Sequence, residues 1–71
     1  MGYNEGMAMK LKVGDLVRAV NVDLGLGLII NYDPYRYYEP YTVRWTNDLY
    51  GKNVWTHDQE ALVPVCQLEA S

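Results

Sequence analysis

Six residues in the middle of the chain, Tyr41-Thr42-Val43-Arg44-Trp45-Thr46, alternate between large apolar or aromatic side chains and polar ones. Successive side chains of a β-strand point to opposite faces, so Tyr41, Val43 and Trp45 would share one face. The intervening polar side chains would share the other. This pattern predicts a strand that covers a hydrophobic core on one side and meets solvent on the other.

Four further short segments have strand-forming composition and are bounded by turn residues. They are residues 16–20, 27–32, 52–56 and 63–65. Proline has no N–H to give to a ladder, so Pro64 predicts that the last strand lies at a sheet edge. Gly27 predicts a bulge or a close backbone contact, and with it strong curvature of the second strand.

The connections between these segments carry turn chemistry. Residues 21–25 contain Asn, Asp and Gly, and residues 33–40 are bracketed by Pro34 and Pro40, which exclude that loop from a central ladder. Residues 47–51 predict a hairpin connection of about five residues, with Gly51 available for positive φ. Residues 57–62 predict one short helical turn before the last strand.

Five short strands with one helical turn predict an all-β fold, a small barrel or sandwich. A chain of 71 residues suffices for one domain, and it would bury only about 60% of the surface that it exposes when unfolded. We expect a flexible N-terminal arm over residues 1–10, the folded domain over 11–66 and a C-terminal tail over 67–71.

Charge and cysteine content restrict the environment and the partners. The net charge is −3, whereas proteins that bind nucleic acid through its phosphates usually present a basic patch. A single cysteine, Cys66, cannot form an intramolecular disulfide, which fits a reducing compartment. Residues 1–10 lack the pattern of a signal peptide, and no stretch approaches the roughly 20 apolar residues of a membrane span. We therefore expect a protein that is neither secreted nor bound to a membrane.

No residue pattern predicts catalysis. The pair His57-Asp58 could resemble an orienting dyad, but adjacent side chains point in different directions and no nucleophile lies near in sequence. His57 and Cys66 lack the paired spacing of zinc ligands, and no lysine, arginine or helix start near Cys66 predicts a reactive thiol. We expect no enzyme, no metal and no cofactor.

The feature in excess of folding needs is a cluster of tyrosines. Five of them fall within ten residues, at positions 32, 35, 37, 38 and 41. So many rings cannot all enter a small core. One interpretation is that Tyr32 and Tyr41 pack at strand ends and the others lie on the surface, where single exposed aromatics are ordinary.

The other interpretation is a contact patch, because tyrosine and arginine are enriched at the centres of protein interfaces. The predicted partner-binding residues are Tyr35, Arg36, Tyr37, Tyr38 and Tyr41. The partner would be a protein, either another copy of the chain or a different protein, and a homo-oligomer could bury exposed edge strands as well.

The alternative partner is single-stranded nucleic acid, whose bases stack on aromatic rings. Arg18, Arg44 and Lys52 would then join the tyrosines in one face. Within the tyrosine-rich stretch itself, Arg36 is offset by Asp33 and Glu39, so the protein partner is favoured.

Several segments in order carry a resemblance to known proteins. They are Lys12-Val13-Gly14-Asp15-Leu16-Val17-Arg18, Gly25-Leu26-Gly27-Leu28-Ile29, Val43-Arg44-Trp45, and residues 57–62 before Val63. Over residues 11–65 the chain resembles SH3-like barrels, above all the small stand-alone SH3-like proteins of tailed bacteriophages, many of them marine. Residues 40–65 also resemble the SH3-like peripheral subunit of photosystem I, and Tudor and KOW barrels share the first two segments.

This resemblance implies a five-stranded SH3-like barrel with a short 3-10 turn before the last strand. It also implies a non-enzymatic interaction module encoded by a phage. Such a protein would be a small virion component or an adaptor for a host protein, located in the host cytoplasm or in the virion. The matching motifs explain the barrel, whereas residues 33–41 lie where the match is weakest.

Overall fold

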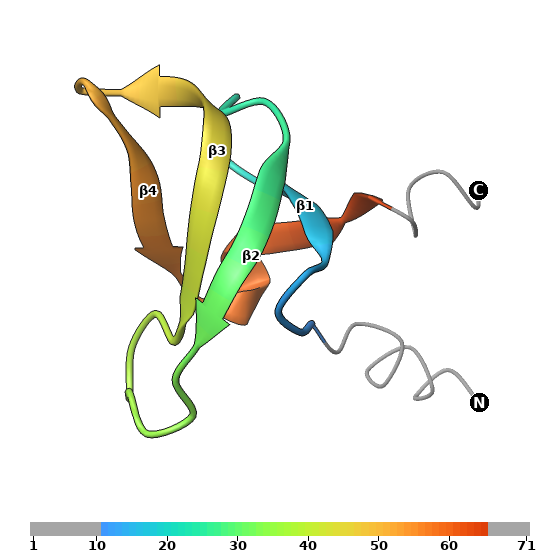
Figure 1. Ribbon diagram of the computed structural model, residues 1–71, viewed down its shortest axis with the longest axis vertical. Coiled ribbons are helices and arrows are strands. Elements are labelled where there is room, and N and C mark those ends of the chain that lie inside the picture. Colours follow the sequence, from blue (N-terminus) through green and yellow to red (C-terminus); the bar gives the residue numbers. More distant parts are fainter. Residues whose placement is uncertain (1–10, 66–71) are drawn as a thin grey trace.

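The computed structural model describes residues 11–65, which form five strands and one short 3-10 helix (Figure 1). The elements are β1 (Leu16–Ala19), β2 (Gly27–Tyr32), β3 (Tyr41–Leu49), β4 (Lys52–His57), η1 (Gln59–Ala61) and β5 (Leu62–Pro64). The predicted arm over residues 1–10, Cys66 and the tail over 67–71 lie outside the described residues.

All five strands belong to one antiparallel sheet in the order β4-β3-β2-β1-β5. The two edge strands are β4 and β5, and no ladder within residues 11–65 joins them, so the sheet is not closed by hydrogen bonds. The all-β class, the five strands and the 3-10 turn before the last strand are confirmed. Pro64 lies in an edge strand, as expected.

The alternating segment of β3 forms the centre of the core. Tyr41, Val43 and Trp45 are buried, with exposed fractions of 5%, 0% and 1%. The intervening Thr42 and Arg44 face outward. The other buried apolar residues come from all parts of the fold and are Leu11, Val17, Leu24, Ile29 and Leu62. The alternation of apolar and polar residues therefore predicted correctly which face of β3 lies in the core.

Gly27 lets the neighbouring strand pack closely against the backbone of β2. A Cβ at this position would lie 2.5 Å from Cζ3 of Trp45 and 2.6 Å from Cγ1 of Val43. The predicted close contact is thus present. The register shift of β2 against β3 comes slightly later, between Ile29 and Asn31, where an extra residue bends the strand.

The β3–β4 connection is shorter than predicted. β3 continues to Leu49, and only Tyr50 and Gly51 connect it to β4, both with positive φ of 57° and 77°. Two central residues with positive φ match the right-handed twist of a two-residue hairpin. The expected five-residue connection was wrong because residues 47–49 continue the strand past an irregularity in the ladder between Arg44 and Leu49.

The substitution Gly27→Ala tests the packing of Trp45 against β2. The added methyl group would force the indole and Val43 to move, so we expect a loss of about 1–3 kcal/mol in the free energy of unfolding, as in other overpacked cores. Urea denaturation followed by tryptophan fluorescence measures it. Asn31→Ala, an exposed change in the same strand, is the control and should alter stability by less than about 0.5 kcal/mol. Equal stability of both variants would show that this contact does not constrain the fold.

Candidate functional site

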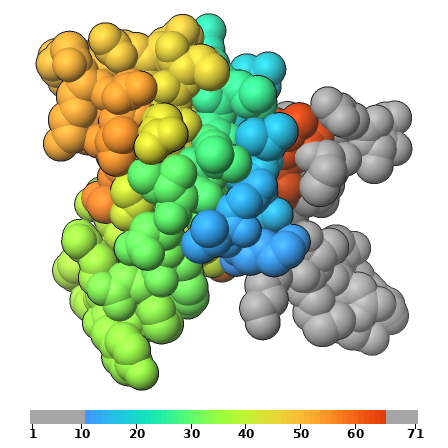
Figure 2. Space-filling model, viewed as in Figure 1, coloured from blue at the N-terminus to red at the C-terminus, as the bar shows by residue number. Residues whose placement is uncertain are grey.

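The segment between β2 and β3, residues 33–40, is an ordered loop that we call the tyrosine loop. Its two ends are joined, because the N–H of Asp33 donates to the carbonyl of Pro40 at 2.9 Å. The loop extends beyond the strands in Figure 1 and forms a separate lobe of the surface in Figure 2. It therefore presents its side chains away from the sheet.

Asp33 organises the first half of the loop. Its Oδ1 accepts a hydrogen bond from the N–H of Tyr35 at 3.0 Å, and its carbonyl accepts one from the N–H of Arg36 at 3.2 Å. An aspartate that bonds the backbone two residues ahead builds a turn with its own side chain. The Pro34-Tyr35 corner is fixed in this way.

Glu39 anchors the second half of the loop to β4 and to the residue before η1. Its N–H donates to Oδ1 of Asp58 at 2.7 Å, and its Oε1 accepts from Oγ1 of Thr56 at 2.9 Å. The residue has a φ of 51°, an uncommon conformation for a non-glycine residue. These two contacts hold it in that conformation.

Three of the loop tyrosines contribute almost nothing to the core. The exposed fractions of Tyr35, Tyr37 and Tyr38 are 95%, 87% and 69%. The rings of Tyr37 and Tyr38 contact each other edge to face, with centroids 4.6 Å apart. The predicted contact residues of the loop are thus exposed together.

Tyr41 differs from the other predicted contact residues, because it is a core residue of β3. Its ring packs at 4.8 Å from that of Tyr32, and its hydroxyl donates to the carbonyl of Leu11 at 3.5 Å. Burial raises the pKa of Tyr41, and Tyr32 and Asp15 add smaller contributions in the same direction. Its assignment to the contact patch is corrected here: alternation along β3 turns it inward.

Arg36 keeps most of its guanidinium available. Its Nε donates to the carbonyl of Tyr38 at 3.2 Å, and it has no ion pair with any residue between 11 and 65. The two nearby carboxylates, Asp33 and Glu39, accept the hydrogen bonds described above instead. The guanidinium therefore stands among exposed rings with donors still free.

The cations of the predicted nucleic-acid face come from three different strands, β1, β3 and β4. Arg44 pairs with Leu28, which pairs in turn with Leu16, so two leucines separate it from Arg18 on β1. Lys52 lies with its Nζ 4.5 Å from the ring centroid of Trp55. The nucleic-acid interpretation remains a prediction.

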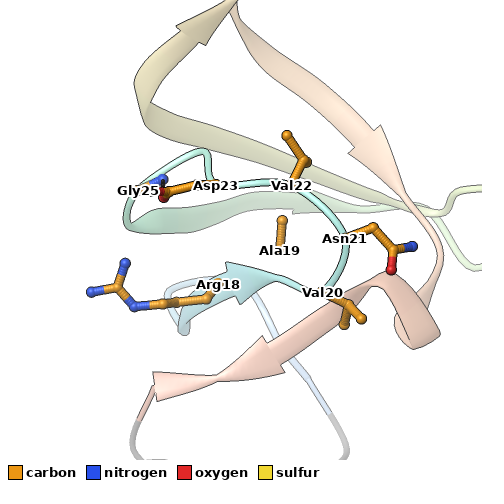
Figure 3. Close-up of a pocket in the computed structure, with 7 residues that line it drawn as sticks. All are labelled: Arg18, Ala19, Val20, Asn21, Val22, Asp23 and Gly25. Atoms are coloured by element: carbon orange, nitrogen blue, oxygen red, sulfur yellow. Dashed lines mark hydrogen bonds between the residues drawn. The ribbon is translucent and has the colours of Figure 1, made fainter.

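Two concave surfaces were missed by the sequence analysis. One is a hollow of about 350 Å³ beside the β1–β2 connection (Figure 3). The other is a groove of about 560 Å³ at β4, lined by Glu39, Thr42, Lys52, Val54, Trp55 and Thr56. Residues 18–23 and 25 of one continuous segment line the hollow, whereas the groove combines residues of β3 and β4 with Glu39.

His57 has a structural contact on the inner face of the sheet. Its Nε2 accepts a hydrogen bond from Nε1 of Trp45 at 3.1 Å, which requires a neutral ring with the proton on Nδ1. Burial lowers the pKa of His57, against the opposing effect of the carboxylates of Glu39 and Asp58. The residue supports the core tryptophan.

The described part of the chain holds no group of three His, Cys, Asp or Glu side chains that could bind a metal ion. None of the helical structure between residues 11 and 65 is long and apolar enough to cross a membrane. In comparisons with protein-family models, with curated proteins and with solved structures, the chain has no significant match.

Acid should destabilise the protein through His57. The pKa of the folded state lies below the 6.5 of an unfolded histidine, so the unfolded state binds more protons and stability falls as pH drops through and below 6.5. Urea unfolding of the wild type and of His57→Gln between about pH 7.5 and 5.5, above the carboxylate range, measures this. We expect the pH dependence in the wild type alone. The same slope in both proteins would contradict it.

Removing the Asp58 carboxylate should release the tyrosine loop without unfolding the sheet. In Asp58→Ala the N–H of Glu39 loses its 2.7 Å acceptor, so we expect its amide to exchange at least tenfold faster with solvent deuterium. The amide of Val43 in the core provides the internal control and should keep its protection. Unchanged exchange at Glu39 would show that the loop is held by other contacts.

Proposed function

We propose that this chain is a non-enzymatic protein-interaction domain that contacts its partner through the tyrosine loop. The observation that carries the proposal is the exposure of Tyr35, Tyr37 and Tyr38 on a loop held by hydrogen bonds at both ends. Rings of this size are costly to leave in water when they could pack elsewhere. Their placement is explained by a partner that covers them.

The order of the loop supports this proposal energetically. Binding costs free energy for every side chain and loop that must be immobilised. The loop is already ordered in the free chain by the hydrogen bonds to Asp33 and by those that join Glu39 to Thr56 and Asp58. Binding therefore loses less conformational entropy. Tyrosine adds large contact area for few rotatable bonds. Arg36 provides directional donors among the rings.

The motif resemblance supports a more specific form of the proposal. The sheet would be an SH3-like barrel of the kind encoded by tailed phages, and the protein a small virion component or an adaptor for a host protein. The five antiparallel strands, with a 3-10 turn before the last one, are compatible with that fold.

The double substitution Tyr37→Ala, Tyr38→Ala tests the contact site. Capture from a lysate of the native source with the immobilised wild type, followed by mass spectrometry, supplies a partner that is then purified. Hot-spot residues cost about 2 kcal/mol or more when truncated, so we expect the double variant to bind this partner at least about 30-fold more weakly. Isothermal titration calorimetry measures the affinity.

A matched control separates the loop from exposed tyrosine in general. Tyr50 is 92% exposed on the β3–β4 turn, and Tyr50→Ala should bind as the wild type does. The unfolding midpoints of all three proteins should agree, because the substituted side chains are exposed. Wild-type affinity in the double variant would contradict the assignment of the site, and a stacked nucleic acid as the captured ligand would favour the alternative function.

A further inference from the structure

The hollow beside the β1–β2 connection is a second surface with no role in the core. In Figure 3 Ala19 lies at its centre, with Arg18 and the Asp23–Gly25 side on one flank and Val20 and Asn21 on the other. Val20 and Val22, at its edge, are 52% and 43% exposed, and their side chains project away from Ala19. The volume of about 350 Å³ is near the lower end of cavities that accept small ligands, roughly 300–1,000 Å³. It suits one inserted side chain better than a peptide.

This hollow is preformed. The N–H of Val20 donates to the carbonyl of Ala61 at 2.9 Å, and the N–H of Gly25 donates to Oδ1 of Asp23 at 3.0 Å. The buried Leu24 fixes the far side, because its carbonyl accepts from the N–H of Asn47 at 3.1 Å. Occupation therefore needs little rearrangement of the connection.

The charges around the hollow complement those of the tyrosine loop. The hollow presents Arg18 and Asp23, which form no ion pair within residues 11–65. The loop presents the guanidinium of Arg36, and it carries two carboxylates, of which Asp33 bonds within the loop and Glu39 bonds Thr56. Arg36 can meet Asp23 across an interface while Glu39 meets Arg18. Such pairing selects one orientation of the partner.

The two surfaces lie at opposite ends of β2. The tyrosine loop follows the last residue of this strand, Tyr32, and the hollow belongs to the connection that precedes its first residue, Gly27. Figure 1 shows the two connections at opposite ends of the sheet. The two surfaces cannot meet within one chain, but the loop of one copy can meet the hollow of a second copy.

We propose that the tyrosine loop of one copy docks in the β1–β2 hollow of a second copy, with the ring of Tyr35 placed over Ala19 at the centre of the hollow. This proposal rests on the proposed function of the loop and names a partner for it, a second copy of this chain. The contact is head-to-tail, because the two copies contribute different surfaces. Repetition closes into a ring or continues as an open array.

Complementation of two defective variants tests this arrangement. The loop variant is Tyr35→Ala, Tyr37→Ala, and the hollow variant is Val22→Arg, which adds a large charged side chain at the edge of the hollow. Each retains one functional surface, so each alone should be monomeric, while an equimolar mixture should form dimers and nothing larger. Sedimentation velocity of the full-length chains over a micromolar to millimolar series measures the masses. The wild type should form dimers and larger species as concentration rises.

Matched controls carry the same substitutions elsewhere. Tyr50→Ala removes an equally exposed ring, and Val13→Arg adds the same charge at a residue that is 55% exposed outside both surfaces. Both should assemble as the wild type does, and the two test variants should weaken association at least tenfold.

A wild type that stays monomeric, variants that assemble normally or a mixture that stays monomeric would overturn the head-to-tail contact. None of these results would contradict the proposed function of the tyrosine loop. That function is tested independently by titrating the captured partner with the Tyr37→Ala, Tyr38→Ala variant.

Discussion

The contact of Trp45 with the bare backbone of Gly27 is the constraint on which the rest of this small fold depends. Trp45 is 1% exposed, and no side chain could stand at position 27 without displacing it. Its indole nitrogen donates to His57 on β4, so one side chain connects the second, third and fourth strands. With that core in place, the strand ends are fixed, and the loops that carry the exposed residues begin and end at defined points.

Local sequence patterns were sufficient to predict much of this architecture. Alternation along residues 41–46 identified the inner face, Pro64 identified an edge strand and Gly27 identified the close contact. The tight turn at Tyr50-Gly51 was not predicted, because tyrosine is an unusual residue at positive φ and only the pairing of Leu49 with Lys52 requires it. Tyr41 was placed both on the inner face of its strand and among the contact residues, and its exposed fraction of 5% agrees with the inner face.

The features that bear on function depend on residues distant in the chain. Glu39 is held by Asp58, 19 positions later, and Val20, at the edge of the hollow, donates to the carbonyl of Ala61. No local composition predicts either. The sequence could therefore place exposed tyrosines between two prolines, whereas the structure adds that the loop carrying them is ordered and that Arg36 has no acidic partner among the described residues.

Chemical-shift mapping by NMR tests most directly whether the tyrosine loop is the contact surface. Amide spectra of the labelled chain would be recorded while the captured partner is titrated in. The account predicts that the largest shifts and the earliest line broadening fall within residues 33–40, with the amides around Val13 and Tyr50 unchanged. Shifts that leave residues 33–40 unaffected and map to another face would contradict it.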